Sequence, residues 1–347
     1  MSRILSYPEA IREAIEQEMQ RDHSVIVIGQ GADDPKRILG TTKGLVEKFG
    51  AARVFDTPLS EDGMTGVAIG AALGGLRPIQ IHIRMDFMLL SMNQIINMAA
   101  KMHYMFGGSV FVPIVIRSII GKSWGQGPQH SQSIYPLLMN IPGIKIMAPS
   151  TPYDAKGCLT SAIRDDNPVI FIEHRLLYYQ KGYVPEEGYT VPFGKARVLA
   201  QGKDITLVGI SQMVIECLRA RRYLLEKGID AEVIDPVSLN PLDIETIIIS
   251  VLKTKRIIIV DNAWMKCGLA AEIIANLTER KLQNNISIKR MGFEFVPCPT
   301  TPVLERKFYP NAKTIAYCAY QEMGGNDKSW VPKTELEIEE VEFKGPF

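Results

Sequence analysis

The chain has 347 residues, of which 46% are hydrophobic and 22% are charged. At roughly 100 to 200 residues per domain, this length predicts two domains and excludes a single small module. The 39 Lys and Arg residues exceed the 38 Asp and Glu residues by one, so the chain lacks the net positive charge that sequence-independent nucleic-acid binding needs.

Short apolar segments alternate with longer amphipathic segments along the first half of the chain. This alternation is typical of βα units around a parallel sheet. We expect helices at residues 7–22, 61–73, 87–105 and 152–164, and strands at 24–29, 53–56, 77–83, 112–117, 144–147 and 168–172. Residues 118–130 are expected to form a glycine-rich loop.

The pattern breaks at residues 178–192, which are polar, contain proline and lack periodicity, so we expect a linker there. Beyond it, strands are expected at residues 205–209, 231–235, 256–260 and 286–290, and helices at 212–227, 242–253 and 268–280. The sequence therefore predicts an α/β fold with two doubly wound domains, 1–190 and the smaller 191–323. The acidic tail at 324–347 contains TELEIEEVEF, which predicts either an edge strand or a solvated arm.

No signal peptide and no membrane-spanning segment are expected, because no apolar run precedes a cleavage site or reaches about 18 residues. The five cysteines are widely spaced and include no C-x-x-C pair, which predicts reduced thiols without a metal role in a cytoplasmic protein. The P-loop, H-E-x-x-H and G-x-G-x-x-G patterns are also missing from the sequence, so the common phosphate-binding, zinc-hydrolase and dinucleotide-binding chemistries lack their motifs.

Glu61 stands in TPLSEDGMTG, where a turn after an expected strand leads into a helix rich in Gly and Ala. A carboxylate there can lie in the crevice at the carboxyl edge of a parallel sheet, which is the usual ligand position in such folds. Alternatively, Ser60 caps the helix and Glu61 only complements its dipole.

Arg84, Asp86 and Phe87 follow the next expected strand and would reach the same edge. Phe87 is either a site aromatic or an ordinary core residue, and the methionine-rich segment after it predicts a core or a subunit interface. His130 ends the glycine-rich loop, where it is either an acid or base or a surface residue that caps the next helix. The remaining histidines, His23, His82, His103 and His174, are scattered singly and suggest no role.

Longer motifs in both halves resemble the beta subunits of the thiamine-diphosphate-dependent 2-oxo acid dehydrogenases. In the first half these are TPLSEDGMTGVAIGAALGGLRPI, DFMLLSMNQIINMAAK, GPQHSQS and IRDDNPVIFIEH. In the second half they are ITLVGISQMVIECLRA, AEVIDPVSLNPLD and GLAAEI, so the resemblance covers roughly residues 5 to 320. It implies a transketolase-like pyrimidine-binding domain followed by a transketolase C-terminal-like domain, in the group that includes pyruvate, branched-chain and acetoin dehydrogenases.

The resemblance also implies roles for single residues. Glu61 would hydrogen-bond the aminopyrimidine ring of thiamine diphosphate, Phe87 would stack on that ring with Ile83 beside it, and His130 would serve reaction intermediates. The carbonyls of Ile114, Ala162, Asp165 and Asn167 fall where family members often hold potassium.

The magnesium-binding and diphosphate-binding motif G-D-G with a following Asn is missing from this sequence. The resemblance therefore implies an alpha subunit that holds magnesium and the diphosphate, with active sites shared between the subunits of an α2β2 heterotetramer. The segment at 81–87 departs from the family's E-F-M-T-F-N-F, so Arg84 and Asp86 can contact an anionic or hydroxylated substrate, each other, or the partner subunit. The segment at 260–264 and the acidic tail also depart from the family pattern.

The leading hypothesis is a beta subunit that decarboxylates a 2-oxo acid and passes the acyl group to a lipoyl group, with a lipoyl acyltransferase as a further partner. The second hypothesis is a split transketolase-like or carboligating enzyme that transfers a two-carbon unit to an aldehyde or sugar. The third is a non-catalytic scaffold subunit.

Overall fold

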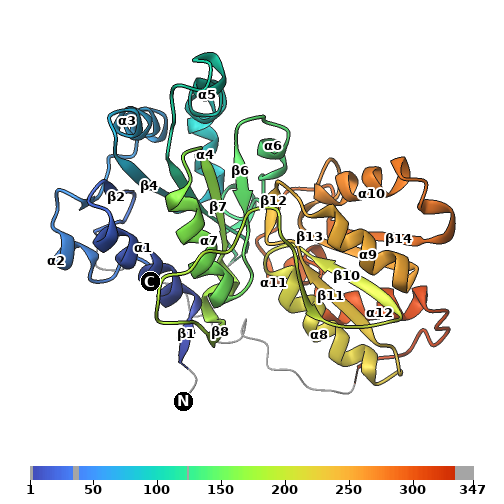
Figure 1. Cartoon of the computed structure of the whole chain (residues 1–347). Coiled ribbons are helices and arrows are strands. Elements are labelled where there is room, and N and C mark those ends of the chain that lie inside the picture. Colours follow the sequence, from blue (N-terminus) through green and yellow to red (C-terminus); the bar gives the residue numbers. More distant parts are fainter. Residues whose placement is uncertain (1–2, 34–38, 123–124, 333–347) are drawn as a thin grey trace. The chain divides into compact units, whose positions relative to one another are not determined.

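The structure, a computed structural model, describes residues 3–33, 39–122 and 125–332. The described residues form two compact units, one from 3–122 with 130–193 and the other from 125–129 with 194–332 (Figure 1). The acidic segment at 334–343, expected as an edge strand or an arm, lies outside the described residues. No helix in the described part of the chain is long and apolar enough to cross a membrane.

The first unit is built on parallel strands in the order β6-β7-β5-β4-β2-β3. These strands are β2 (Val25–Gly29), β3 (Val54–Phe55), β4 (Arg77–His82), β5 (Val115–Ile120), β6 (Lys145–Met147) and β7 (Val169–His174). β2, β5 and β7 are buried along their whole length, because helices cover both faces of a parallel sheet. Their continuous apolar sequences follow from this burial, and the expected α/β class is confirmed.

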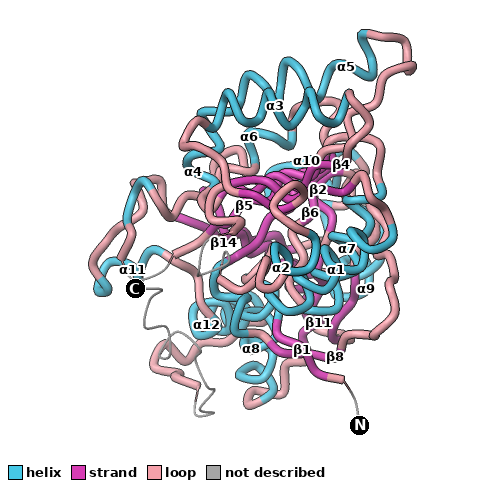
Figure 2. Tube along the Cα trace, turned by 90° about the vertical axis from the view of Figure 1, so that its left-hand side faces the viewer, coloured by secondary structure: helices cyan, strands magenta, loops and turns pink. Residues whose placement is uncertain are grey.

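Helices flank this sheet on two sides, with α3 and α5 on one side and α1, α2 and α7 on the other (Figure 2). The helices are α1 (Tyr7–Arg21), α2 (Leu45–Phe49), α3 (Glu61–Leu73), α5 (Ala100–Met105), α6 (Pro136–Met139) and α7 (Pro152–Arg164). The expected helix at 7–22 forms as α1, which buries Ala10, Ile11, Ala14 and Ile15 at the helical spacing seen in the sequence.

The expected single helix at 87–105 is wrong. The segment winds as α4 (Met85–Met88), a 3₁₀ turn at Leu89–Ser91, a π-helix at Gln94–Ala99 and then α5. Its buried residues Met88, Ser91, Ile95 and Ala99 still recur every three or four positions. The apolar period therefore cannot reveal a change of hydrogen-bond pattern within the segment.

The expected strand at 112–117 is displaced, since β5 begins at Val115 and runs to Ile120. Pro113 lacks the N–H that a sheet ladder needs, which explains why the strand begins later. The start of the expected linker is also wrong: a 3₁₀ turn forms at Arg175–Tyr179, and β8 (Lys181–Tyr183) pairs antiparallel with β1 (Ile4–Ser6). Strands of three residues carry too little periodicity to be predicted.

The segment after β8 is tied to the first unit. The buried Lys156 ammonium donates to the carbonyls of Pro185, Glu186 and Glu187 at 2.7, 3.0 and 3.0 Å. Farther along, the Val191 N–H donates to the Gly157 carbonyl at 3.0 Å. We call residues 184–191 the exit segment, and these bonds attach it to α7.

The second unit has strands in the order β14-β13-β10-β11-β9, with β9 antiparallel at one edge. The strands of this sheet are β9 (Arg197–Ala200), β10 (Ile205–Gly209), β11 (Ala231–Asp235), β13 (Arg256–Trp264) and β14 (Ser287–Phe293), and the short β12 (Ser238–Asn240) lies outside it. The helices are α8 (Met213–Leu225), α9 (Ile244–Thr254), α10 (Leu269–Glu279), α11 (Pro302–Phe308) and α12 (Ala312–Glu322), with 3₁₀ turns at Gly127–Gln129 and Gln283–Asn285.

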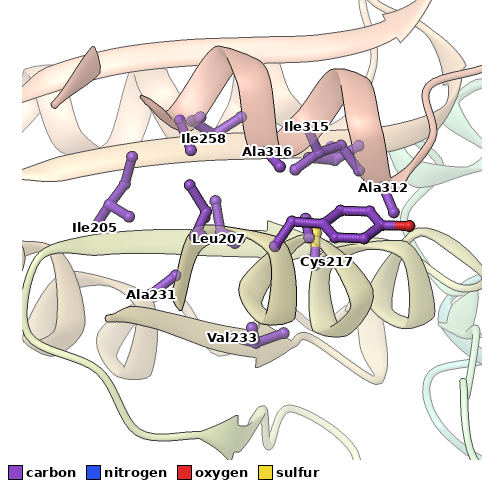
Figure 3. Close-up of a cluster of buried hydrophobic side chains, with 14 of the residues drawn as sticks. Ile205, Leu207, Cys217, Ala231, Val233, Ile258, Ala312, Ile315 and Ala316 are labelled. Carbon is purple, nitrogen blue, oxygen red and sulfur yellow. The ribbon is translucent and has the colours of Figure 1, made fainter. Parts of the chain in front are cut away.

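The four strands expected in this unit all form, whereas β9, β12, α11 and α12 were missing from the sequence-based expectation. The omission of α12 matters for the core, because Ala312, Ile315 and Ala316 pack with Leu207 and Ile258 of the sheet (Figure 3). Small alanines on α12 allow the helix to approach the sheet closely. They also weaken the apolar signal by which a helix is recognised in a sequence.

Candidate active site

The carboxyl ends of β2, β4, β5 and β7 meet at one edge of the first unit's sheet. Strand pairing places Gly29 beside Ile81, His82 beside Ser118, and Ile120 beside His174. In open α/β sheets this edge is where ligands bind. The predicted residues Glu61, Arg84, Asp86, Phe87 and His130 all belong to this first unit.

Glu61 is the first residue of α3 and is half-buried. Its Oε1 accepts a hydrogen bond from the Gln30 side chain at 2.8 Å, and Gln30 directly follows β2. Ser60 makes no side-chain capping bond, so the alternative in which Ser60 caps the helix receives no support. The sequence did not identify Gln30 as a site residue, because only the pairing of the strands brings it to α3.

Gly29 lets β2 approach β4 closely just before Gln30. Its φ is +137°, and a Cβ atom there would lie 2.4 Å from the carbonyl oxygen of Ile81. A side chain is therefore incompatible with this approach. The neighbouring loop is held by Asp56, which accepts from the N–H groups of Gly31 and Thr57 at 2.8 and 2.9 Å.

Phe87 and His130 come together as a second part of the site. Their ring centroids lie 5.2 Å apart with an interplanar angle of 79°, which is an edge-to-face contact. Phe87 is 36% exposed, so it is not the ordinary core residue of the alternative interpretation. The structure thus joins two predicted residues that lie 43 positions apart in the sequence (130 − 87).

Asp86 and Arg84 form a buried polar group next to Phe87. Asp86 Oδ1 accepts from the backbone N–H and side chain of Gln132 at 3.2 and 2.8 Å, whereas burial raises the pKa of Asp86. Arg84 donates to the carbonyl of Ile83 at 2.8 Å. Burial lowers the pKa of Arg84 to about 10, and the negative charge of Asp86 opposes this shift.

A second arginine, Arg175, directly follows β7. The sequence did not identify it as a site residue. Burial, and then the like charge of Arg84, lower its pKa to about 9. The two arginines therefore concentrate positive charge at the ends of β4 and β7. Their juxtaposition depends on the sheet order, which no local motif discloses.

His82, to which the sequence assigned no role, also lies at this edge. It is the last residue of β4, its side chain is buried, and burial lowers its pKa to about 4 against the opposing charge of Glu61. A single histidine after an apolar run gives no sequence signal for such a place.

The residues predicted to bind potassium lie around the carboxyl end of α7 and the starts of β5 and β7. The carbonyls of Ile114 and Ala162 accept backbone hydrogen bonds at 2.9 and 3.3 Å from the N–H groups of Val169 and Asp165. The Arg77 guanidinium donates to the carbonyls of Ile163 and Asp165 at 3.1 and 3.0 Å. The Asp165 carboxylate also accepts a hydrogen bond from the side-chain amide of Asn167 at 3.1 Å. Arg77 therefore already supplies positive charge to part of this group, and the potassium site stays a prediction.

Buried histidines predict a pH dependence of stability. Burial lowers the pKa of His174 to about 3, with smaller contributions from Lys122 and Arg175. An unfolded histidine has a pKa near 6.5, so between about pH 6.5 and 4 the unfolded chain binds more protons and stability falls as pH falls. Each such histidine contributes about 1.4 kcal/mol per pH unit in this window. We expect a lower urea midpoint at pH 5 than at pH 7 for the full chain.

His174→Asn provides the matched comparison, because an amide oxygen can replace the Nδ1 that accepts from the Leu176 N–H at 3.1 Å. The difference between the two midpoints should shrink in this variant. An unchanged difference would show that His174 becomes protonated without unfolding.

The chain is similar to known proteins over most of its length. The family model for the pyrimidine-binding domain of transketolase matches residues 4–181, and the model for the transketolase C-terminal domain matches residues 194–315. The chain is 45% identical to the beta subunit of acetoin:2,6-dichlorophenolindophenol oxidoreductase from Cupriavidus necator, over 94% of this chain and 99% of that one. It is 43% identical to the beta subunit of the pyruvate dehydrogenase E1 component from Porphyra purpurea, over 88% of this chain and 92% of that one.

A solved structure described as a split gene transketolase, an inactive beta4 tetramer, is similar with a TM-score of 0.74 at 20% identity. The match covers 92% of this chain and 98% of that one. At this identity the similarity supports the fold alone.

Proposed function

We propose a function from one premise, which is that this chain belongs to the transketolase-like family of 2-oxo acid dehydrogenase beta subunits. The chain would form half of a thiamine-diphosphate-dependent enzyme that decarboxylates a 2-oxo acid and transfers the acyl group to a lipoyl group. The observation that carries this proposal is that one unit holds both the Gln30–Glu61 hydrogen bond and the Phe87–His130 ring contact. Glu61, Phe87 and His130 stand in the sequence motifs by which the family was predicted.

The residues at this edge fit the pyrimidine half of thiamine diphosphate. Glu61 is half-buried with one oxygen bonded to Gln30, and Phe87 offers a partly exposed ring for stacking. When bound, the cofactor would supply a nucleophilic carbon to attack the 2-oxo group and a cationic ring to accept the electron pair released with carbon dioxide. Glu61 would hold a proton at its carboxylate against the ring nitrogen, and Ile83 would contact the same ring.

The remaining site residues would act on the substrate. His130, held edge-on by Phe87, would give or take a proton at a substrate oxygen. Arg84 would bind the carboxylate of the 2-oxo acid, because Arg175 adds a second buried positive charge nearby. Asp86 would orient His130, whose charge acts on the Asp86 carboxyl group.

The proposal assigns magnesium and the diphosphate to an alpha subunit, since the G-D-G motif is missing from this sequence. The relatives are named as beta subunits, which supports an alpha partner and an oligomeric enzyme. An α2β2 heterotetramer, a lipoyl acyltransferase partner and potassium at Ile114, Ala162, Asp165 and Asn167 belong to the same proposal.

One observation favours a second candidate, a carboligating enzyme that joins a two-carbon unit to an aldehyde or sugar. The Oδ2 atom of Asp86 is buried and makes no hydrogen bond to any described residue, while its Oδ1 is held by Gln132. A substrate hydroxyl would satisfy this oxygen. A 2-oxo acid without a hydroxyl group would leave it unsatisfied.

The test is to purify the native complex through a tag on this chain, identify its stoichiometric partner and measure bound thiamine diphosphate. We expect a partner that carries the G-D-G motif, and a complex that acylates a lipoyl domain when given a 2-oxo acid. A new carbon–carbon bond without lipoyl acylation would establish the second candidate. A complex without cofactor would leave the scaffold hypothesis.

A further inference from the structure

His82 carries a buried polar atom that the described structure does not satisfy. The side chain is 3% exposed, and its Nε2 has no hydrogen-bond partner among the described residues. Leaving such an atom unsatisfied costs its full desolvation penalty, and native proteins seldom accept this cost without a reason. The atom therefore calls for a partner in the complete site.

Strand and helix geometry places His82 beside Glu61. Gln80 and His82 lie on the same face of β4, because side chains alternate along a strand. Gln80 donates to the Thr65 hydroxyl of α3 at 2.9 Å, which shows that this face is turned toward α3. Thr65 lies one helical turn after Glu61, so the two share one face of the helix.

The directions of α3 and β4 also bring His82 and Glu61 together. Because α3 lies between β3 and β4 in the chain, and both strands run parallel to β2, α3 runs opposite to β4. A step of two residues along β4 covers roughly 6.6 Å, and one turn back along α3 covers roughly 5.4 Å. Two residues beyond the Gln80–Thr65 contact, His82 therefore lies next to Glu61. This position agrees with the charge of Glu61, which acts to raise the pKa of His82.

The two oxygens of the Glu61 carboxylate differ in their partners. Gln30 donates to Oε1, whereas Oε2 receives no hydrogen bond from the residues that the structure describes. We propose that His82 is a positioning residue for Glu61, and that its Nε2–H donates to this second carboxylate oxygen in the assembled, cofactor-bound enzyme. The inference rests on the proposed function in assigning Glu61 to the pyrimidine ring.

The environment of His82 suits a neutral donor. Glu61 of α3 is the charged group that acts on it, and the nearby polar groups Gln80, Thr65 and Ser91 are neutral. Because burial lowers the pKa of His82 to about 4, the ring is uncharged near neutral pH. It can thus fix the carboxylate and favour its ionised form without adding a second positive charge beside the pyrimidine.

The experiment compares His82→Phe, which fills the space without a donor, with His82→Gln, which keeps an amide N–H donor. Each beta chain is co-assembled with its alpha subunit, and thiamine diphosphate is titrated by quenching of intrinsic fluorescence. Activity is then followed from about pH 5.5 to 8.5 to locate the acidic limb of the profile. Gln80→Met is the matched control, because it removes a buried amide from the same face of β4, two residues before His82.

For His82→Phe we expect about tenfold weaker cofactor binding, about tenfold lower kcat with little change in KM, and an acidic limb displaced upward by about one pH unit. The limb moves upward because losing a donor makes the ionised carboxylate less stable. His82→Gln should stay within about threefold of wild type, as should Gln80→Met.

Wild-type affinity and an unchanged limb in His82→Phe would overturn the inference, as would equal losses in the phenylalanine and glutamine variants. If His82→Phe fails to assemble, His82→Ala replaces it and the same comparison with His82→Gln decides. A wild-type complex that binds no thiamine diphosphate would overturn the proposed function and this inference with it. Normal cofactor binding by every variant would overturn the inference alone.

Discussion

Replacing Glu61 by glutamine is expected to lower the turnover of the assembled enzyme by about 100-fold or more, because the variant loses a catalytic proton partner. The fold should be kept, since a glutamine oxygen can still accept the hydrogen bond that Gln30 donates to Glu61 at 2.8 Å. The measurement is kcat of the αβ complex together with its sedimentation, which reports assembly separately from chemistry.

Asp62→Asn is the matched control for this variant. Asp62 stands next to Glu61 in the first turn of α3, but its side chain is exposed. Neutralising it alters the charge at the helix terminus without removing the proposed proton partner. Near-normal turnover in Glu61→Gln, or an equal loss in Asp62→Asn, would contradict the assignment of Glu61.

Replacing Arg117 by methionine is expected to lower the free energy of unfolding by about 3 to 5 kcal/mol, because it leaves the Glu173 carboxylate buried without its cation. Arg117 of β5 and Glu173 of β7 are fully buried and joined by two hydrogen bonds of 2.7 and 2.9 Å. Burial acts to lower the pKa of Arg117, but the charge and hydrogen bonds of Glu173 raise it above its ordinary value. Urea unfolding of the full chain at pH 7 measures the effect.

The double variant Arg117→Met with Glu173→Leu separates the cost of an orphaned charge from the value of the pair. It should be more stable than Arg117→Met alone, because apolar replacements of a whole buried pair are often nearly neutral. Some loss should remain, since the Tyr178 hydroxyl donates to Glu173 at 2.6 Å and would lose this acceptor. As a surface control, Arg12→Ala breaks the half-exposed pair with Glu16 and should cost less than about 1 kcal/mol. If the double variant is less stable than the single one, the loss in Arg117→Met does not come from an orphaned Glu173 charge.

The sequence predicts those site residues that stand in long local motifs. Glu61, Phe87 and His130 were found because their neighbours form segments that resemble one family over most of the chain. The same segments predicted the two α/β domains, since continuous apolar strands and amphipathic helices leave a strong periodic signal. The family matches over 4–181 and 194–315 confirm this resemblance.

The residues that were missed depend on which strands are neighbours. Gln30 reaches Glu61 only because β2 lies beside β4, and Arg175 meets Arg84 only because β7 and β4 both flank β5. Sheet order is a long-range property that periodicity does not encode. The π-helix at Gln94–Ala99 was missed for a different reason, because its buried residues keep a spacing that an α-helix would also give.

The exit segment bears on how the chain can be divided for experiments. Lys156 is fully buried, and three of its hydrogen bonds go to carbonyls between residues 185 and 187. A fragment that ended soon after β8 would remove these three acceptors and leave the buried ammonium group with the Glu13 carboxylate as its remaining partner among the described residues, which is costly. A fragment that contains the first unit alone therefore needs a C-terminus beyond Val191. A protease that cleaves within 184–191 should act only after the hydrogen bonds between the exit segment and α7 have broken.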